Sequence, residues 1–255
     1  METPIIHLDH VHYSYPGQKE KVLEDIVFKF FKGEKIGLIG PNGVGKTTFL
    51  HICMGLITPL KGKVFFKGKD INDKKVLAEL RRSIGFVFQN PDDQLFCPTV
   101  LEDVAFGPLN LGLSPKEAKR VSLKALEKVG LLGFENRITH KLSGGEKKLL
   151  SIATVLAMNP EAILLDEPTT GLDIYSRQRI IDVIKKLDQS LIIVSHDWDF
   201  LAETVEKFYV LYDKKLYLVE KETLHVHYHS HPSGEVPHEH SMFELIKINH
   251  KKEIN

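Results

Sequence analysis

The octapeptide from Gly40 to Thr47 constrains the fold of this chain more than any other segment. It fits the pattern G-x-x-x-x-G-K-[ST], in which glycines let successive backbone N–H groups turn inward around phosphates. The apolar run 35–39 before it and the helix-forming run 47–52 after it place this loop between a strand and a helix N-terminus, which is an anion site. A glycine-rich turn without a ligand is the weaker alternative. The residues expected to contact a nucleotide are Gly40, Pro41, Asn42, Gly43, Val44, Gly45, Lys46, Thr47 and Thr48.

A second run, 162–167, is apolar for four residues and then carries Asp166 and Glu167. This pattern is typical of a buried parallel strand that ends at a ligand crevice. We expect Lys46 to reach the β- and γ-phosphate oxygens during catalysis, and Thr47 and Asp166 to hold Mg²⁺. Glu167 lies one residue further on, where its carboxylate can polarise the water that attacks the γ-phosphate. A solvated Asp-Glu pair is the alternative, which the phosphate loop disfavours.

A third motif, Leu142-Ser143-Gly144-Gly145-Glu146, lies between the other two. Ser-x-x-Glu before an apolar-periodic stretch is a capping box that starts a helix. The N-terminus of that helix would present free N–H groups to a phosphate, so we expect Ser143, Gly144 and Gly145 to contact the nucleotide. The inner side of the helix is predicted to carry Leu149, Leu150, Ile152, Ala153 and Leu156.

Together these motifs resemble those of the ATPase subunits of ATP-binding cassette (ABC) transporters, and the resemblance covers about residues 4 to 220. It implies that ATP and Mg²⁺ are the cofactors. It also implies that Tyr15 stacks on adenine, although Tyr13 is nearby and either ring can simply pack. Gln89 would be a sensor that contacts the nucleotide and Mg²⁺ and takes part in catalysis.

The resemblance implies two further roles late in the chain and meets one departure. Asp173 would contact the nucleotide from the loop Thr170-Gly171-Leu172-Asp173. His196, after the strand-like run 191–195, would touch the γ-phosphate as a catalytic switch, although a lone histidine at a strand end is more often structural. Glu146 stands where the family usually has glutamine. Its charge near a triphosphate could weaken closure of the site, slow turnover, or do little if Glu146 turns toward solvent.

The segment 88–96, followed by 99–108, is more specific than the general motifs. It resembles the energy-coupling factor branch of the family, and most of all its cobalt and nickel importers. In that branch the region lines a groove that receives helices from a transmembrane partner. The residues alone support a more modest reading, in which Thr99 is the N-cap of a helix with apolar positions at Val100, Leu101, Val104 and Ala105.

Composition agrees with a cytoplasmic subunit that needs partners in the membrane. In 255 residues, no run reaches the ~18 apolar residues of a membrane span, and the polar start Met1-Glu2-Thr3 is not a signal peptide. Two cysteines, Cys53 and Cys97, suit a reducing compartment, and Cys53 is expected in the core. Lys plus Arg equal Asp plus Glu at 34 each, so we expect no nucleic-acid partner.

We expect one ATPase domain over 1–220, with an α/β phosphate-loop (RecA-like) core, an N-terminal antiparallel β lobe and an inserted helical subdomain over about 95–158. The residues 4–34 read as short strands, and 62–68 as a strand between glycine turns. Strand and helix patterns alternate again from Ile163, which completes the core.

A histidine-rich tail is predicted to follow over 221–255. In an extended chain, side chains two residues apart share one face, so its first four histidines can share a borderline cation such as Ni²⁺, Co²⁺ or Zn²⁺. A strand with solvated histidines, or a tail with no metal task, is the alternative. The candidate ligands for Ni²⁺ or Co²⁺ are His225, His227, His229, His231, His238 and His240.

These inferences predict the ATP-hydrolysing subunit of an energy-coupling factor importer for Ni²⁺ or Co²⁺, peripheral at the cytoplasmic face of the cell membrane. Its expected partners are a transmembrane energy-coupling subunit, a substrate-binding membrane subunit and a second ATPase copy in a head-to-tail homodimer. A vitamin importer of the same branch, a soluble cassette ATPase and a metal-buffering protein are the alternatives.

Overall fold

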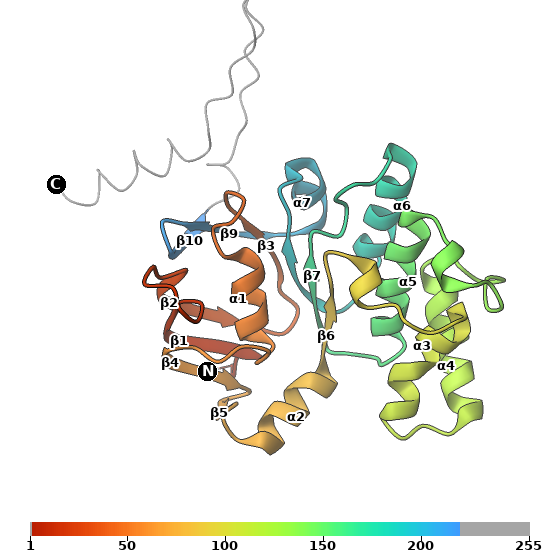
Figure 1. The fold of residues 1–255 in the computed structure, drawn as a ribbon, viewed down its shortest axis with the longest axis horizontal. Helices are drawn as coiled ribbons and strands as arrows, with labels where there is room; N and C mark the ends of the chain where they lie inside the picture. Colours follow the sequence, from red (N-terminus) through yellow and green to blue (C-terminus); the bar gives the residue numbers. More distant parts are fainter. Residues whose placement is uncertain (1, 220–255) are drawn as a thin grey trace, which may run out of the picture.

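Two β-sheets organise the computed structural model, which describes residues 2–219 (Figure 1). The histidines predicted to bind metal therefore lie outside the described residues. A four-stranded antiparallel sheet has the order β2-β1-β4-β5, and a six-stranded sheet has the order β10-β9-β3-β8-β7-β6. This arrangement, with helices packed on the larger sheet, confirms the predicted fold class.

The antiparallel sheet forms the predicted N-terminal lobe. Its central strand β1 pairs with β2 on one side and with β4 on the other. The side chains of β1 and β2 alternate between buried and more exposed positions, as expected for a sheet with one face on the core. The strands of this lobe are β1 (Ile6–Tyr13), β2 (Leu23–Phe30), β4 (Lys61–Phe66) and β5 (Lys69–Asp70).

The larger sheet is parallel from β9 to β6 and ends in an antiparallel hairpin of β9 and β10. Every residue of β7 and β8 is buried, as the apolar runs predict. Its strands are β3 (Lys35–Ile39), β6 (Ile84–Val87), β7 (Ala162–Asp166), β8 (Ser190–Val194), β9 (Lys207–Tyr212) and β10 (Lys215–Val219). The carboxyl ends of β3, β6, β7 and β8 meet at one edge, where such sheets bind ligands.

The helices divide into those beside the parallel sheet and a group at one side of it (Figure 1). Helices α3, α4 and α5 pack on one another in that group, within the predicted range 95–158. The limits of this subdomain and of the ATPase domain stay predictions. The helices are α1 (Lys46–Cys53), α2 (Lys74–Ser83), α3 (Val100–Asn110), α4 (Pro115–Lys128), α5 (Gly144–Leu156), α6 (Ile174–Lys185) and α7 (Trp198–Thr204), with 3₁₀ turns η1 (Pro91–Asp93) and η2 (Thr139–Lys141).

Local signals account for several helix starts. Thr99 caps α3 and Ser114 caps α4, each in a full capping box with a glutamate three residues on. The sequence patterns did not predict α2, in which only Val76 and Leu80 are buried. Cys53 is fully buried, as expected. Within residues 2–219 no helix combines the length and apolar character that crossing a bilayer requires.

Candidate active site

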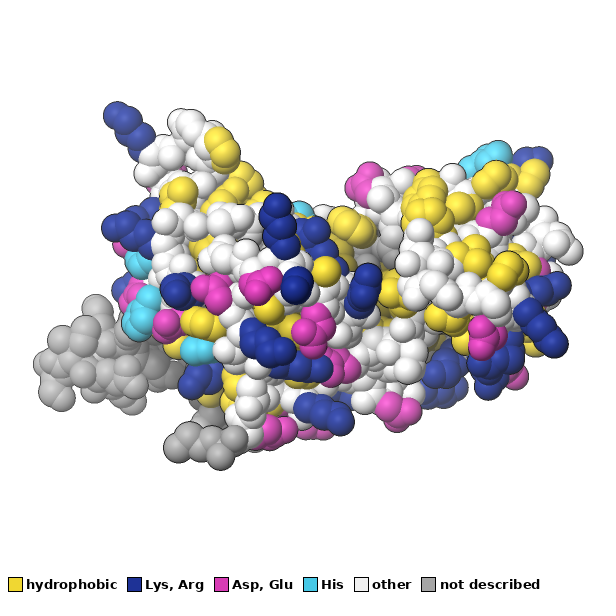
Figure 2. Space-filling view, turned by 90° about the horizontal axis from the view of Figure 1, so that it is seen from below, with side chains coloured by type: hydrophobic (Ala, Val, Ile, Leu, Met, Phe, Trp, Pro, Cys, Tyr) yellow, Lys and Arg dark blue, Asp and Glu magenta, His cyan; other side chains and the backbone are white. Residues whose placement is uncertain are grey.

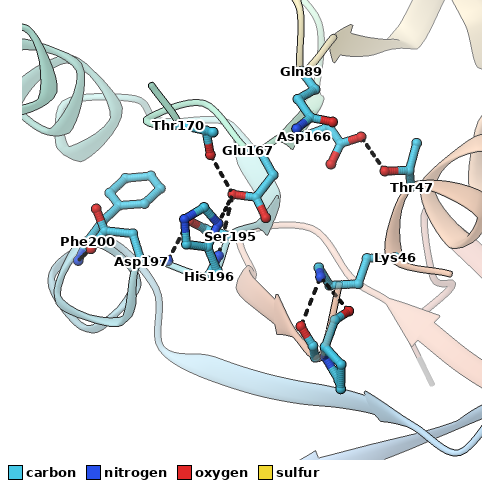
Figure 3. Close-up of polar contacts among 12 residues, drawn as sticks. Lys46, Thr47, Gln89, Asp166, Glu167, Thr170, Ser195, His196, Asp197 and Phe200 are labelled. Carbon is cyan, nitrogen blue, oxygen red and sulfur yellow. Dashed lines mark hydrogen bonds and ion pairs between the residues drawn. The ribbon is translucent and has the colours of Figure 1, made fainter. Parts of the chain in front are cut away.

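A cleft of about 850 Å³ lies at the carboxyl ends of the parallel strands, and most of the predicted nucleotide contacts line it. Figure 3 shows how several of these side chains converge from the phosphate loop and from the ends of β7 and β8. The predicted residues that line the cleft are Tyr15, Asn42, Gly43, Val44, Gly45, Lys46, Thr47, Thr48, Gln89, Asp166, Glu167 and His196. The volume falls in the range of small-molecule sites.

The phosphate loop takes a backbone path that only glycine allows. Gly40 and Gly45 have φ angles of 157° and 110°, which side chains rarely adopt. A Cβ at Gly40 would stand 2.4 Å from the carbonyl oxygen of Leu211, and one at Gly45 would stand 2.6 Å from Val22 Cγ1. No side chain caps α1 at Gly45, so its first N–H groups are available to an anion.

Lys46 is buried at the start of α1 and turns back along the loop. Its Nζ donates to the carbonyl oxygens of Gly40, at 2.9 Å, and Pro41, at 3.0 Å (Figure 3). Burial lowers the pKa of Lys46 from its ordinary value, while Glu167 and Asp166 oppose the shift. The ammonium is thus held at the loop by backbone carbonyl groups.

Thr47 and Asp166 face each other as the predicted magnesium pair. The Thr47 hydroxyl donates to Asp166 Oδ2 at 2.7 Å. The other oxygen, Asp166 Oδ1, is buried and has no hydrogen-bond partner among the described residues. Burial is the main cause that raises the pKa of Asp166. A hydroxyl beside a buried carboxylate with a spare oxygen fits Mg²⁺, which prefers oxygen ligands, and Gln89 lines the same cleft.

Glu167 leaves β7 in a strained backbone conformation that turns its side chain toward β8. Its φ is 46°, in the left-handed region, which for a non-glycine residue often marks a functional site. Its Oε2 accepts the Thr170 hydroxyl at 2.9 Å and lies 2.8 Å from His196 Nδ1 (Figure 3). The two residues predicted to act at the γ-phosphate are therefore in direct contact. Thr170, in the turn after Glu167, is a partner that sequence reasoning missed.

Tyr15, rather than Tyr13, lines the cleft. Tyr13 is buried, and its ring meets Tyr15 edge-on at 5.2 Å. The phenol oxygen of Tyr15 lies 2.6 Å from Thr48 Oγ1, while 42% of the residue stays exposed. One face of an aromatic ring at the mouth of the cleft can stack on a nucleotide base.

The serine-glycine motif at 143–145 lies beside Asp173, because Gly145 packs against Ser176, whose hydroxyl donates to Asp173 Oδ2 at 2.7 Å. Neither lines the cleft of its own chain. Ser143 and Glu146 form the predicted capping box of α5. Asp173 caps α6 by accepting the N–H groups of Tyr175 and Ser176 at 2.9 and 3.0 Å. These two helix N-termini therefore present a separate surface.

The charge of Glu146 has a partner. Its Oε2 accepts the Ser143 N–H at 2.8 Å, and its Oε1 lies 3.5 Å from the guanidinium of Arg137. The Arg137 guanidinium also stacks 3.5 Å from the centroid of the Phe134 ring. The carboxylate that replaces the usual glutamine is held by the helix start and by a cation.

A second hollow of about 520 Å³ lies in the segment that resembles the energy-coupling factor branch. Figure 2 shows hydrophobic side chains gathered on the half of the molecule that carries α3 to α5. Phe96 is 65% exposed and meets the ring of Phe106 edge-on at 4.7 Å. Burial raises the pKa of Cys97, on the hollow, to about 11. The hollow is lined by Asp92, Leu95, Phe96, Cys97, Pro98, Thr99, Ile138, Thr139 and His140.

A lysine and an arginine near the site were also missed by the sequence reasoning. Lys148 lies on the inner face of α5. A lysine among the apolar residues of that face is a sequence signal that could have indicated a buried polar contact. Arg177 forms a two-pronged ion pair with Asp197, the residue after His196, at 2.5 and 2.7 Å. Among residues 2–219 no group of three or more His, Cys, Asp or Glu side chains is arranged to hold a metal ion.

Comparison with known proteins agrees with this geometry. The family model described as "ABC transporter" matches residues 23–170. The energy-coupling factor transporter ATP-binding protein EcfA of Methanocaldococcus jannaschii is 49% identical over 83% of this chain and 77% of its own length. The structure of cbiO1 from Clostridium perfringens, described as part of the ABC transporter complex cbiONQ, has a TM-score of 0.76 and 35% identity over 85% of this chain and 88% of that one.

A solved dimer gives a second structural match. The ATP-binding cassette MJ0796, in a dimeric post-hydrolysis state bound to ADP and Pi, has a TM-score of 0.76 and 30% identity, over 84% of this chain and 98% of that one. The family model covers more than half of the sequence, and the relatives match nearly all of the described residues. This chain therefore belongs to the ABC transporter family, as its ATP-binding and ATP-hydrolysing domain.

Proposed function

We propose that the chain is the ATPase subunit of an energy-coupling factor importer, in which ATP-driven closure of two copies acts on a transmembrane partner. One observation carries the proposal. The cleft of one chain gathers the phosphate loop, Asp166, Glu167 and His196, whereas Ser143 and Asp173 stand together outside it. A second copy that presents those two helix N-termini would complete the phosphate cage.

Within one chain, the contacts suit an in-line attack on the γ-phosphate. The N–H groups at the start of α1 and the Lys46 ammonium would bind the β- and γ-phosphate oxygens. Glu167 would orient the attacking water and accept its proton, with Thr170 and His196 holding the carboxylate in place. His196 would also donate to the γ-phosphate.

Mg²⁺, when bound, would neutralise charge on the β- and γ-phosphates. Thr47 and Asp166 would hold it, with Gln89 at the same edge of the cleft. Tyr15 would stack on adenine from the N-terminal lobe. Tyr15 follows strand β1 of the antiparallel lobe and Asp166 ends strand β7 of the parallel core, so a bound nucleotide would contact both parts of the fold.

The second copy would lie antiparallel (head to tail) about a two-fold axis, so that the same surface of each copy faces the other and the assembly is closed. Ser143 and Gly145 of one copy would contact the γ-phosphate held by the other, and Asp173 would lie beside them. The relative with 30% identity was solved as a dimer bound to ADP and Pi, which supports an assembly of two copies. The chain would then form a homodimer with two equivalent nucleotide sites.

The energy-coupling factor assignment rests on the names of EcfA and of cbiO1 of the cbiONQ complex, together with the second hollow. Its exposed Phe96 and Ile138, 65% and 39% exposed, would receive a helix of the transmembrane subunit. A substrate-binding membrane subunit would complete the importer at the cytoplasmic face of the membrane. Nickel or cobalt as cargo is supported by the resemblance of 88–108 and by the histidine pattern of 225–240.

A complementation experiment tests the shared sites. Ser143→Arg and Glu167→Gln are each expected to be inactive as homodimers. A mixed dimer keeps one intact site, so an equal mixture should regain about a quarter of wild-type activity, because about half of the dimers are mixed and each has one good site of two. A mixture that stays inactive, and monomeric by size-exclusion chromatography with ATP, contradicts the sandwich.

Purification with membrane proteins tests the importer. The chain should co-purify with small, highly hydrophobic proteins when it is expressed with the genes encoded beside it. Uptake of radioactive Ni²⁺ or Co²⁺ by cells with that complex should be lost in Lys46→Ala. Uptake of a vitamin instead of a metal would show that the cargo is not nickel or cobalt. Metal retention that persists in Lys46→Ala would indicate that the protein buffers metal instead of transporting it.

A further inference from the structure

Lys148, in the second turn of α5, is a buried cation to which no step described above assigns a task. Its residue is only 3% exposed. Its ammonium donates to the carbonyl oxygen of Glu167 at 3.2 Å and to that of Phe88 at 3.5 Å, and it makes a short contact with the carbonyl oxygen of Gln89. From helix α5, this one side chain thus binds the backbone that follows two strand ends, those of β6 and β7.

The position of Lys148 on α5 makes this cation unexpected from packing alone. It shares the inner face of the helix with Leu149 and Ile152, both fully buried. Burial lowers the pKa of Lys148 to about 8, even though Asp166 and Glu167 favour its charged form. An aliphatic side chain would pack there without a desolvation penalty. The carbonyl groups around the ammonium offset that penalty and explain the choice of lysine.

The strands that these carbonyls follow are neighbours in the sheet. Strands β6 and β7 run parallel, with Val87 paired to Leu165. Strand β6 ends at Val87, before Gln89, and β7 ends one residue after Leu165, at Asp166, which still pairs with β8 and directly precedes Glu167. No strand pairing between β6 and β7 continues past that pair, so the spacing of the two exits depends on other contacts. The Lys148 ammonium is the contact that reaches both.

Gln94 makes a second, independent connection between the same exit and α5. Its Oε1 accepts the N–H of Phe88 at 3.1 Å. Its Nε2 donates to the Ser151 carbonyl at 2.9 Å and to Thr154 Oγ1 at 2.8 Å. The N–H and the carbonyl of Phe88 are therefore both held from α5, one through Gln94 and one through Lys148.

We propose that Lys148 is a positioning residue that sets the spacing between Gln89 and Glu167 and fixes both to helix α5. The inference rests on the proposed function for the roles of Gln89 and Glu167. Ser143 caps the N-terminus of α5. The same ammonium therefore joins the helix that would serve the second copy's nucleotide to the backbone of the two residues that serve the nucleotide of its own chain. Misplacement of a catalytic group by about 1 Å costs on the order of 100-fold in rate.

The test replaces Lys148 by methionine, which keeps an unbranched side chain and removes the charge. The matched control is Lys147→Met, the preceding residue of the same helix, whose ammonium pairs with the exposed carboxylate of Asp92 at 2.6 Å. We expect Lys148→Met to lower kcat for ATP about 10- to 100-fold and to leave KM for ATP and the affinity for a fluorescent ATP analogue within about three-fold. The control should stay within about two-fold in all three.

Gln94→Leu is the second variant, because it severs the other connection without removing a buried charge. It should likewise lower kcat while leaving KM nearly unchanged, with a smaller loss of about 3- to 10-fold in kcat. Melting curves identify the temperatures at which each variant is folded, and the kinetics are measured there.

Two results would overturn the positioning role. One is a kcat of Lys148→Met no lower than that of Lys147→Met, and the other is a loss that appears in KM alone. If Lys148→Met does not fold, an unchanged kcat in Gln94→Leu overturns the role. A failure of the proposed chemistry is seen separately, since it would leave Glu167→Gln as active as the wild type.

Discussion

Replacing Glu167 by glutamine isolates the basicity of its carboxylate from its shape. Oε2 of Glu167 accepts the Thr170 hydroxyl at 2.9 Å and lies 2.8 Å from His196 Nδ1. A glutamine amide oxygen can take both contacts, because it accepts hydrogen bonds in the same direction. The residue is 7% exposed, and the substitution changes no heavy-atom count, so the fold and the cleft should persist.

The expected loss follows from the general-base role. Removal of a positioned general base lowers a rate by roughly 10²- to 10⁴-fold, which is about 2.7 to 5.4 kcal/mol at 1.36 kcal/mol for each factor of ten. Contacts to the phosphates are untouched, so the affinity for ATP with Mg²⁺ should change by less than about three-fold. The variant should therefore accumulate with ATP bound, and as a dimer.

Phosphate release at saturating ATP measures the loss, and size-exclusion chromatography with and without ATP measures the dimer. Glu203→Gln is the matched control, because this glutamate pairs with Lys185 on the surface at 2.5 Å. Its activity should equal that of the wild type. If Glu167→Gln turns over ATP within about three-fold of the wild type, the base is another group and the role given to Glu167 is wrong.

Three further outcomes follow from other contacts. Arg177→Met should lower the melting temperature by about 4 to 8 °C, because two partly exposed charged bonds to Asp197 contribute about 2 kcal/mol, and circular dichroism measures it. Glu146→Gln should leave ATP hydrolysis within about three-fold in a phosphate-release assay, since Arg137 balances the carboxylate. Truncation after Glu220 should abolish most Ni²⁺ binding by calorimetry while hydrolysis stays within a few-fold. In the intact chain that binding should be strong at pH 7.5 and weak at pH 5, because imidazole with a pKa of about 6.5 binds metal only when neutral.

Each of these three predictions has a result that would contradict it. For the ion pair, the control is Arg179→Met, because the Arg179 guanidinium is exposed and donates to the Gly130 carbonyl at 3.4 Å. Equal melting temperatures of the two variants would show that the pair of Arg177 with Asp197 does not stabilise the fold. A ten-fold change in Glu146→Gln would show that the carboxylate acts on the nucleotide. Tight Ni²⁺ binding by the truncated chain would place the metal site within the described residues.

Much of the site could be predicted from short segments of the sequence. The glycines of the phosphate loop, the hydroxyl of Thr47 and the change from apolar residues to Asp166 and Glu167 depend only on neighbours along the chain. The capping box at Ser143 is equally local, since its two hydrogen bonds join residues three apart. Such features could be predicted because they depend on short-range backbone geometry and on the spacing of apolar residues along the chain.

Other parts of the site required the tertiary structure, because they depend on which distant segments pair. The sequence pattern does not distinguish Tyr13 from Tyr15. Only the packing of β1 decides that Tyr13 is buried and that Tyr15 lines the cleft. The contact of Arg137 with Glu146 crosses from a loop to a helix start. The sequence did not predict α2, because its apolar face is narrow: only Val76 and Leu80 are buried in it.

Lys148 shows the boundary between the two kinds of information most clearly. It lies four residues before Ile152, a spacing that places it on the buried face of a helix, and that much follows from the sequence by itself. A charge is tolerated there because β6 and β7 are adjacent and the residues that follow them, Gln89 and Glu167, turn their carbonyl groups toward the Lys148 ammonium. Residues 88 and 167 lie far apart in the chain, so only the folded sheet, by closing that long loop, brings their carbonyl groups to one ammonium.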